Sequence, residues 1–418
     1  DFENIELIKK LYIDFQPDCV VGCSFYPSYI ASRLLNYLKN DKNILTSLKK
    51  PLWADLFGHV MAEAQARAFV DDDDGCIFHY WNSEYNIITT ADIFSCVSDR
   101  QRYALIGELG AVGRLNKYTA GYEFTNTIPC GMPSEGFIHE KKVLRGTQFI
   151  KDDDFVILWS GGYNTWTDVV TLFEGLELAM EVNPKIKFVS TGGEIPEQDI
   201  KTYPMFLSMI EKSKYRDNFI MKGWVPGEEV HNYYLEADIG INIDKNIYEV
   251  KLGSKNRILD WFRAGLCVLS SNVCELTDII EKERIGFTFS PGNKRELSEK
   301  ILMLANDIEK VKKTGQKGRQ FGLKNFSFEN TTVSLCNWAK NPCFAPDSLT
   351  ERKIFFDKEE ALRNLDIISQ KQKKMIEKRD RRIKELELLV HKNPIFKLYG
   401  FIKIISRKLK GKLKGGIY

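Results

Sequence analysis

The feature that most constrains the fold of this chain is a repeated alternation between short apolar runs and longer amphipathic stretches. In consecutive βα units, strands buried on both faces are read as apolar runs, and the helices between them carry one apolar face. The alternation therefore predicts an α/β protein with parallel sheets. The predicted strands are Cys19–Ser24, Leu52–Ala54, Ile93–Val97, Thr127–Pro129, Phe155–Trp159, Lys187–Ser190, Phe219–Lys222, Ile239–Ile243, Val268–Ser270 and Phe287–Phe289.

Helical spacing of apolar residues fills the segments between these strands. In the second half the βα series is almost unbroken, which predicts a doubly wound domain. The predicted helices are Ile5–Phe15, Tyr29–Asn40, Val60–Phe69, Trp166–Met180, Tyr203–Lys212, Gly227–Leu235, Lys255–Ala264, Cys274–Glu283 and Lys294–Asn306.

The length of the chain predicts more than one domain, because 418 residues exceed a single ordinary core. The polar segment Pro133–Asp154 is interpreted as a linker between an N-terminal Rossmann-like domain (1–150) and a C-terminal one (151–345). Residues 346–418 form a third region. Its dense charges and helically spaced apolar residues predict a long amphipathic helix, with a coiled coil as one interpretation.

Composition narrows the class of protein. The chain is 43% hydrophobic and 28% charged, as in soluble globular proteins, and it has neither a membrane-length apolar run nor a signal peptide. Its nine cysteines lack metal-binding spacing, and most lie in apolar runs, so buried thiols in a reducing, cytoplasmic compartment are expected. The chain begins at Asp1 in a helical pattern, which suggests that an upstream segment has been removed.

A glycine pair follows the strand at Phe155–Trp159. Gly161 and Gly162 would let a ligand approach the backbone, and a helix N-terminus after them would offer N–H groups and positive potential. Thr165 with Asp168 resembles a capping box at that helix start. A tight turn without a ligand is the alternative. Since the turn is not G-x-G-x-x-G, a nicotinamide enzyme is disfavoured.

A second glycine turn precedes a helix rich in cations. Gly253 and Ser254 lead into a first turn that contains Lys255 and Arg257, a combination suited to a diphosphate. Asp260 lies further along the same, mostly apolar helix. A buried carboxylate needs hydrogen-bond donors, which ribose hydroxyls would supply. The alternative is a solvated helix start with Asp260 in an internal salt bridge.

These motifs together resemble a known family. Residues 155–341 are similar to the donor-binding domain of family 4 and related GT-B glycosyltransferases, the glycosyl transferases group 1 superfamily. The likeness is carried by FVILWSGGYNTWTD, KGWVPGEEVHNYYLEADIGINI, EVKLGSKNRILDWFRAGLCVLSS and IIEKERIGFTFSPGN, and more weakly upstream by KKPLWADLFGHV, ADIFSCVSDRQR and NTIPCGMP. It implies the GT-B fold, with two Rossmann-like domains around a cleft.

The resemblance implies roles at the donor site. Glu249 takes the place of the first carboxylate of the family's Glu-x7-Glu pair, near the sugar, and Asp260 takes the second, on the ribose. The spacing here is longer, and Asp replaces Glu. Lys255 and Arg257 would hold the diphosphate and stabilise charge on the leaving group.

The same resemblance implies that Trp224 and Val225 border the base, with the Val225 backbone reading its edge. Gly161 and Gly162 would leave room at the cleft.

The acceptor side is marked by Asp55, which follows a predicted strand and would act as a base or stabilise the transition state, assisted by His59. The alternative is that Asp55 caps the next helix. A complete family member would have a further strand and a Gly-rich loop before Asp1, so the N-terminal domain is expected to be truncated.

Two other features are interpreted without a ligand. Asp71–Asp74 could be taken for a manganese-binding DxD motif, but it follows a helix, so a solvated acidic loop is preferred and no metal is expected. His79 and Tyr80–Trp81 are interpreted as packing at a loop or strand edge.

The segment Asn393–Tyr418 mixes aromatic residues with lysines, which favours an anionic membrane surface over nucleic acid. A peripheral location at the inner face of the membrane follows. Residues 350–391 would form a homodimer or hold the tail away from the catalytic body.

The resulting expectation is a transferase that moves a sugar from a nucleotide diphosphate sugar to a saccharide or lipid-linked saccharide, in cell-surface polysaccharide biosynthesis. Retention of configuration is implied by the family, and the nucleotide sugar is a substrate, with no cofactor expected. The alternatives are a sugar-nucleotide epimerase of the same fold and a non-catalytic scaffold.

Overall fold

The computed structural model of the chain describes residues 4–40, 48–196, 198–348 and 358–392. It divides into two compact units, Asp1–Arg352 and Lys353–Tyr418. Among the described residues, none of the helices combines the length and the apolar character that crossing a bilayer requires.

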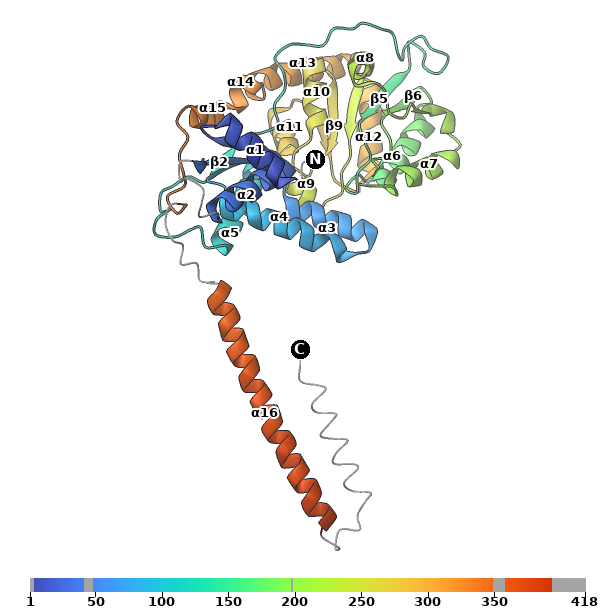
Figure 1. The fold of residues 1–418 in the computed structure, drawn as a ribbon. Coiled ribbons are helices and arrows are strands. Elements are labelled where there is room, and N and C mark those ends of the chain that lie inside the picture. The colour runs from blue at the N-terminus through green and yellow to red at the C-terminus, as the bar shows by residue number, and fades with distance from the viewer. Residues whose placement is uncertain (1–3, 41–47, 197, 349–357, 393–418) are drawn as a thin grey trace. The chain divides into compact units, whose positions relative to one another are not determined.

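The first unit contains a four-stranded parallel sheet, the N-terminal sheet (Figure 1). Its strands lie in chain order: β1 (Val20–Cys23), β2 (Leu52–Leu56), β3 (Ile93–Cys96) and β4 (Thr125–Thr127). The helices between and before them are α1 (Ile5–Phe15), α2 (Phe25–Asn40), α3 (Val60–Asp71), α4 (Ile77–Thr90) and α5 (Asp99–Ala111), with a 3-10 turn at Asp74–Cys76.

A six-stranded parallel sheet, the C-terminal sheet, follows in the order β10-β9-β8-β5-β6-β7. The order reverses between β5 and β8, as in doubly wound folds, where ligands bind outside the carboxyl ends of the strands at the reversal. The strands are β5 (Phe155–Ser160), β6 (Ile186–Thr191), β7 (Phe219–Met221), β8 (Ile239–Asn242), β9 (Cys267–Ser271) and β10 (Phe287–Phe289).

Helices pack on both faces of the C-terminal sheet (Figure 1). They are α6 (Val169–Val182), α7 (Thr202–Glu211), α8 (Val230–Glu236), α9 (Tyr248–Leu252), α10 (Asn256–Ala264), α11 (Glu275–Glu283), α12 (Lys294–Ala305) and α13 (Ile308–Asn325). The short 3-10 helices η3 (Arg216–Asn218) and η4 (Gly227–Glu229) flank β7.

After α13 the chain returns to the N-terminal sheet through α14 (Phe328–Thr331) and α15 (Val333–Lys340). Ser327 forms a bridge with Met132, and Trp338 packs edge-on against the buried Trp53 with ring centroids 5.5 Å apart. The two sheets are therefore tied together by the end of the first unit.

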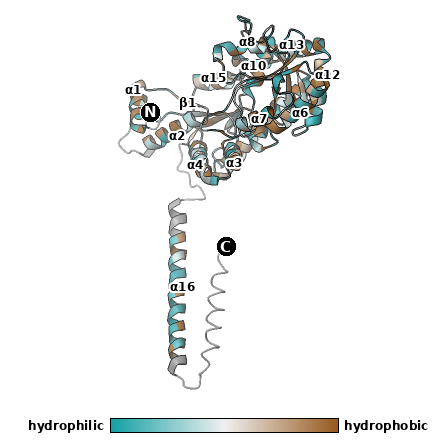
Figure 2. Cartoon of the chain, turned by 90° about the vertical axis from the view of Figure 1, so that its right-hand side faces the viewer, coloured by the Kyte–Doolittle hydropathy of each residue, from teal (hydrophilic) through white to brown (hydrophobic). Residues whose placement is uncertain are grey.

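The second unit is described over one helix, α16 (Lys358–Lys392). Its residues 365–388 are all exposed, and Figure 2 shows mostly hydrophilic colours along it. The predicted long helix is confirmed. The coiled coil and the homodimer stay predictions, and the basic tail 393–418 lies outside the described residues.

The α/β fold with parallel sheets is confirmed, and several local predictions are wrong. The strand expected at Thr127–Pro129 is β4 at Thr125–Thr127, and α6 begins at Val169 because Asp168, not Thr165, is its cap: Asp168 Oδ1 accepts the N–H of Thr171. His79–Trp81 lie in α4, since their aromatic side chains occupy helical positions rather than a strand edge.

The cysteines divide more evenly than expected. Three are buried and three are exposed, because apolar runs in the sequence mark strand ends and helix surfaces as well as cores. The buried ones are Cys96, Cys267 and Cys274; the exposed ones are Cys23, Cys336 and Cys343. The domain boundaries at residues 150 and 345 stay predictions.

Candidate active site

The glycine pair after β5 lies at the point where the strand order reverses. Gly161 has a φ of +94°, and a Cβ there would lie 3.5 Å from Nη2 of Arg257. A Cβ on Gly162 would come within 2.3 Å of the Ile195 side chain and 3.4 Å of the Trp224 ring. Glycine is therefore favoured at 161 by its positive φ and at 162 by the close approach of Ile195, while Arg257 and Trp224 lie at ordinary contact distance from the turn.

Arg257 comes from the first turn of α10 and reaches this glycine turn. Its guanidinium lies 4.0 Å from the centroid of the Trp159 ring, and Nη2 donates to the Gly162 carbonyl at 3.4 Å. Nη1 is buried and has no hydrogen-bond partner among the described residues. Burial lowers the pKa of Arg257. A buried cation with a free donor is suited to an anionic ligand such as a diphosphate.

Of the two helix starts predicted at Thr165 and Ser254, only the second lies at the Gly161–Gly162 turn. The start of α10 meets the Gly161–Gly162 turn through Arg257. The start of α6 is displaced to Val169, so its free N–H groups do not follow the glycine pair directly. The Thr165 carbonyl instead accepts a hydrogen bond from Nζ of Lys245 at 2.7 Å.

Lys255 is held between two carboxylates. Its ammonium lies 3.5 Å from Oδ1 of Asp244 and 3.7 Å from Oε2 of Glu249, and 5.3 Å from the Trp166 ring centroid. Burial alone would lower the pKa of Lys255, but the charges of Asp244 and Glu249 raise it. The structure therefore places Lys255 in an internal ion cluster rather than open to solvent at the helix start.

Asp244 is the member of this cluster that the sequence prediction missed. It follows the end of β8, is 3% exposed, and accepts a hydrogen bond from Nδ2 of Asn242 at 2.7 Å. Its own N–H donates to Oγ of Ser271 at 2.9 Å. A polar residue directly after a buried parallel strand is the sequence signal that could have identified it.

Glu249 lies on α9, one turn before the Gly253–Ser254 turn. Burial raises the pKa of Glu249 to about 7, with Lys255 opposing the shift and Asp244 and Glu63 adding to it. Its Oε2 accepts no hydrogen bond from the described residues.

The turn itself is compact: the Gly253 N–H donates to the Glu249 carbonyl at 3.0 Å, and a Cβ on Gly253 would lie 2.8 Å from that oxygen. Ser254 hydrogen-bonds the Cys130 thiol, whose pKa burial raises to about 11 despite this bond.

Asp260 lies three residues after Arg257, on the same side of α10. It is half-buried, and burial raises its pKa, partly offset by Arg263. None of the described residues donates a hydrogen bond to it.

Trp224 and Val225 follow β7. Trp224 is 60% exposed and donates from Nε1 to the Glu194 carbonyl at 3.0 Å, which places its ring beside Gly162. Val225 packs against a cluster of buried apolar residues on the sheet. The structure thus brings Trp224 to the glycine turn and directs Val225 inward.

The acceptor-side residues lie at the carboxyl edge of the N-terminal sheet. Asp55 ends β2 next to Leu56, its Oδ1 accepts from Oγ of Ser95 at 2.5 Å, and burial raises its pKa. The charge of Asp55 also contributes to the raised pKa of Cys130, the thiol that hydrogen-bonds Ser254 at the second glycine turn. Asp55 does not cap α3.

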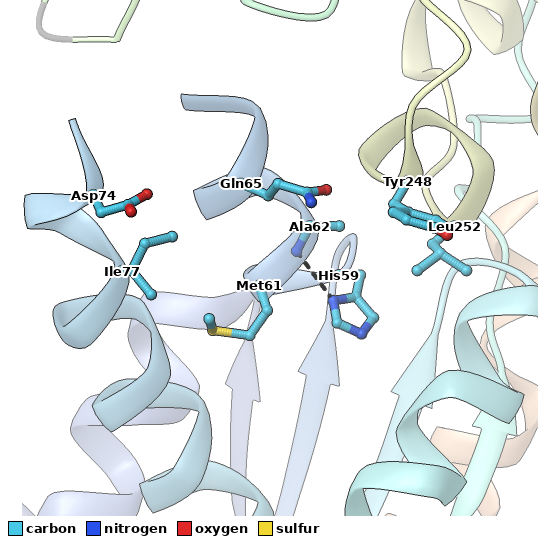
Figure 3. A pocket seen from close by; sticks show the side chains of 8 residues that line it. All are labelled: His59, Met61, Ala62, Gln65, Asp74, Ile77, Tyr248 and Leu252. Carbon is cyan, nitrogen blue, oxygen red and sulfur yellow. Dashed lines mark hydrogen bonds between the residues drawn. The ribbon is translucent and has the colours of Figure 1, made fainter. Parts of the chain in front are cut away.

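His59 is the residue that caps α3, because its Nδ1 accepts the N–H of Ala62 at 3.3 Å. It also lines a cavity of about 570 Å³ between α3, α4 and α9 (Figure 3). Asp55 and Arg257 do not line this cavity. The lining residues are His59, Met61, Ala62, Gln65, Asp74, Ile77, Tyr248 and Leu252. The acidic segment Asp71–Asp74 is exposed, as expected of a solvated loop.

Hydrogen bonds join the N-terminal half of the first unit to its C-terminal half near this cavity. Oγ of Ser98 donates to the Leu252 carbonyl at 2.8 Å, and Glu275 accepts the N–H groups of Asp99 and Arg100 at 3.3 and 3.1 Å.

Residues 140–321 match the family described as glycosyl transferases group 1. The fold is similar to that of a sucrose-phosphate synthase from Thermosynechococcus elongatus (TM-score 0.60, 14% identity), over 80% of this chain and 76% of that one. It is also similar to Anabaena HepE in complex with UDP and glucose (TM-score 0.57, 11% identity, 81% of this chain and 84% of that one).

A third similar structure is an α,α-trehalose-phosphate synthase (UDP-forming) from Burkholderia vietnamiensis, with a TM-score of 0.57, 9% identity, and 81% and 77% of the two chains covered. The comparison with curated proteins found no match. The family match over the C-terminal sheet and the shared two-sheet fold lead to one conclusion: residues 140–321 form a glycosyl transferases group 1 domain in a chain with a GT-B-like fold, and the protein is a nucleotide-sugar-dependent glycosyltransferase of this group.

Proposed function

We propose that the chain transfers a sugar from a UDP-sugar to a saccharide or lipid-linked saccharide in the biosynthesis of a cell-surface polysaccharide. The observation that carries the donor half is the unpartnered Nη1 of Arg257, held at the glycine turn where the strand order reverses. UDP is proposed as the nucleotide because the similar structures include one with bound UDP and one described as UDP-forming.

The residues at the two glycine turns have distinct proposed roles. Arg257 and the backbone N–H groups at the start of α10 bind the diphosphate and stabilise the charge that develops on it as the sugar leaves. Lys255 adds positive potential from within its ion cluster. Asp260, which lacks a donor among the described residues, accepts the ribose hydroxyls.

The remaining groups surround the base and the sugar. Trp224 borders the base beside Gly162, and the backbone of Val225 reads its edge. Glu249 contacts the donor sugar with Oε2, which is ion-paired with Lys255 but accepts no hydrogen bond from the described residues. Asp55, across the cleft, stabilises the transition state or accepts a proton from the acceptor.

Calorimetry of the full chain with UDP, GDP and dTDP tests the donor half. Tight binding is expected for UDP, and Arg257→Ala should weaken it by at least about tenfold, since a charge-assisted hydrogen bond is lost. Arg295→Ala is the control: it also removes an arginine near a helix start, but its side chain is exposed on α12. Absence of binding by all three nucleotides would instead support a scaffold.

The acceptor half is tested by incubating the chain with a radiolabelled UDP-sugar, with and without membrane extract. Label transferred to a saccharide or lipid fraction only in the presence of extract supports transfer. Conversion of the sugar nucleotide without any acceptor would support the epimerase.

Two partners remain proposals that do not depend on the site. Residues 350–391 would pair with a second copy, and residues 393–418 would bind an anionic membrane surface at the inner face of the membrane. Sedimentation velocity and co-sedimentation with anionic vesicles, each with and without residues 350–418, test them.

A further inference from the structure

Two carboxyl groups, buried Glu84 and half-buried Glu108, lie close to the His59 side of the cavity between α3, α4 and α9. Glu84 of α4 is 5% exposed, and no donor reaches its Oε2. Burial, then the charge of Glu108 and a hydrogen bond to it, raise the pKa of Glu84 well above its usual value. A hydrogen bond between Glu84 and Glu108 of α5 requires a proton on one of the two carboxyl groups, and burial favours it on Glu84.

Glu108 connects this acid to the cavity wall. Its Oε1 lies 3.1 Å from Nε2 of His59, and the His59 side chain is 15% exposed. At the other side of the ring, Nδ1 accepts the backbone N–H of Ala62 at 3.3 Å. Because Nδ1 acts as an acceptor, the ring proton is on Nε2 and is donated to Glu108.

The arrangement leaves His59 with no free nitrogen. Both of its ring nitrogens are engaged within the protein, so the ring is held in a fixed orientation in the cavity wall. It also caps the N-terminus of α3, whose first turn contributes Met61 and whose second turn contributes Gln65 to the wall of the same cavity (Figure 3).

The remaining polar groups of the cavity are neutral or acidic. Gln65, Asp74 and Tyr248 supply an amide, a carboxylate and a phenol, and no lysine or arginine of the described part of the chain lines the cavity. The Asp74 carboxylate disfavours an anionic ligand. The closest cation to a lining residue among the described contacts is Lys251, which stands over the Tyr248 ring with its ammonium 5.5 Å from the ring centroid. The apolar side chains of the wall fit the C–H faces of a sugar ring.

We propose that this cavity binds an uncharged sugar unit of the acceptor, and that Glu108, which contacts His59 from α5, is the positioning residue that fixes His59 in the cavity wall. The proposal rests on the proposed transfer to a saccharide. It assigns His59 a role in shaping the acceptor site and excludes it as a proton acceptor in this arrangement.

Long-range 15N–1H correlation NMR on the full chain, labelled at its five histidines, tests the network directly. His59 is expected as the Nε2–H tautomer at neutral pH, and its signals should shift in Glu108→Ala. An imidazolium or an Nδ1–H tautomer in the unmodified chain would overturn the assignment.

Saturation-transfer NMR with 4-nitrophenyl β-glucoside and 4-nitrophenyl β-glucuronide tests the cavity. The glucoside should bind at millimolar concentration and the glucuronide at least about tenfold more weakly. Equal or tighter binding of the glucuronide, or no binding of the glucoside, contradicts the proposal.

Variants separate positioning from folding. Glu108→Ala should weaken glucoside binding by about tenfold, because it leaves the His59 N–H and the Glu84 carboxyl without an acceptor. Glu84→Gln, whose amide can still donate to Glu108, should retain more affinity than Glu84→Leu; equal losses would refute the shared-proton arrangement. Glu123→Ala, on the exposed approach to β4, is the control.

UDP calorimetry on the same variants distinguishes this proposal from the proposed function. Unchanged UDP binding with lost glucoside binding locates the defect in the cavity. Loss of UDP binding in the unmodified chain would instead remove the donor assignment, and with it the premise of an acceptor.

Discussion

Lys255 and Arg257 differ in how much hydrogen-bonding capacity they have left for a ligand, although both are cations at the same helix start. Asp244 and Glu249 already share the Lys255 ammonium, whereas Arg257 has a buried nitrogen without a partner. The negative charge of Glu249 therefore competes with an incoming diphosphate for the same positive potential. The protonation state of Glu249 becomes a determinant of donor affinity.

We expect the affinity for UDP-glucose to fall as the pH rises from 6 to 8. The pKa of Glu249 is raised to about 7, above the ordinary 4.5, so the group is mostly neutral at the lower pH and mostly ionised at the higher one. An added negative charge near the diphosphate should cost about 1 kcal/mol, or roughly fivefold in Kd. Calorimetry measures this dependence.

Glu249→Gln is the matched variant for this pH series, because the amide cannot ionise. Its Kd should vary little over the same range. UDP-glucose serves better than UDP, since its diphosphate has no terminal phosphate group to titrate near neutral pH. An unchanged pH dependence in Glu249→Gln would show that another group is responsible.

At the scale of helices and strands, the N-terminus of α5 is bound by α11 and the residues just before it, which belong to the C-terminal half of the first unit. Glu275 at the start of α11 accepts two of its free N–H groups, and the Arg100 side chain returns to pair with Asp278 and to donate to the Val273 carbonyl at 2.8 Å. A carboxylate at a helix N-terminus is favourable both as a hydrogen-bond acceptor and through the helix dipole. These contacts hold α5 against the donor half.

Glu275→Ala should lower the free energy of unfolding by about 1 kcal/mol, because two N–H groups of α5 lose their acceptor. Urea unfolding followed by circular dichroism measures the shift in midpoint. Glu283→Ala is the control on the same helix, since its side chain has no hydrogen-bond partner among the described residues. Equal shifts in both variants would mean that the carboxylate at α5 contributes nothing specific.

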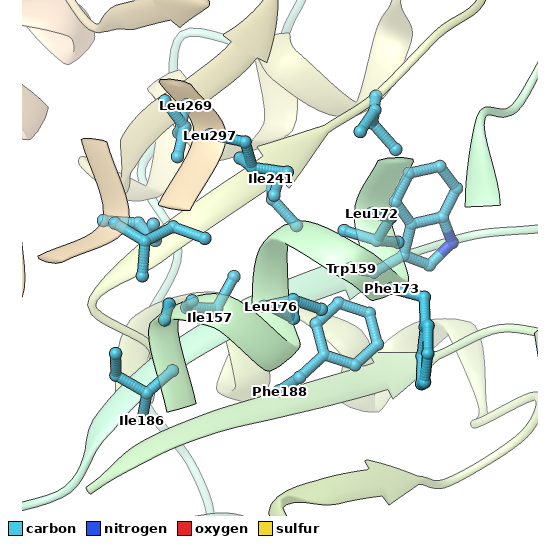
Figure 4. Close-up of a cluster of buried hydrophobic side chains, with 14 of the residues drawn as sticks. Ile157, Trp159, Leu172, Phe173, Leu176, Ile186, Phe188, Ile241, Leu269 and Leu297 are labelled. Atoms are coloured by element: carbon cyan, nitrogen blue, oxygen red, sulfur yellow. The ribbon is translucent and has the colours of Figure 1, made fainter. Parts of the chain in front are cut away.

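The sequence predicted the C-terminal sheet well because its strands are buried on both faces. All six residues of β5 are buried, and Figure 4 shows Ile157 and Trp159 packed with Leu172 and Leu176 of α6. In the N-terminal half, α5 was not predicted, because its sequence has little apolar periodicity and its first turn is stabilised by Glu275, 175 residues away from Arg100 in the chain.

In the candidate site, too, the features that depend on neighbouring residues in the sequence could be predicted, and those that depend on distant ones could not. Arg257 and the Gly161–Gly162 pair were identifiable, because each is local to a turn after a strand or before a helix. The engagement of Lys255 by Asp244 and of His59 by Glu108 was not, since each pair is formed by different elements of the fold.

On the scale of the whole first unit, the segment that follows α15 is held against the N-terminal sheet by a buried ion pair. Nη2 of Arg114 lies 2.9 Å from Oδ1 of Asp347, and both side chains are 0% exposed. The Arg114 guanidinium also donates to the carbonyls of Ile88 and Ala91. Nearby, Asp92 accepts the N–H of Ala345 at 2.9 Å. The last residues of the unit therefore complete the first sheet's core.

Asp347→Ala should destabilise the chain by about 3–5 kcal/mol, because it leaves the Arg114 charge buried without its partner. The double variant Arg114→Leu with Asp347→Leu should lose less, since it removes both charges and keeps apolar volume, although the carbonyls of Ile88 and Ala91 lose a donor. Urea unfolding measures both. A double variant less stable than Asp347→Ala would mean that the carbonyl contacts of Arg114, rather than its charge pair, hold this segment against the N-terminal sheet.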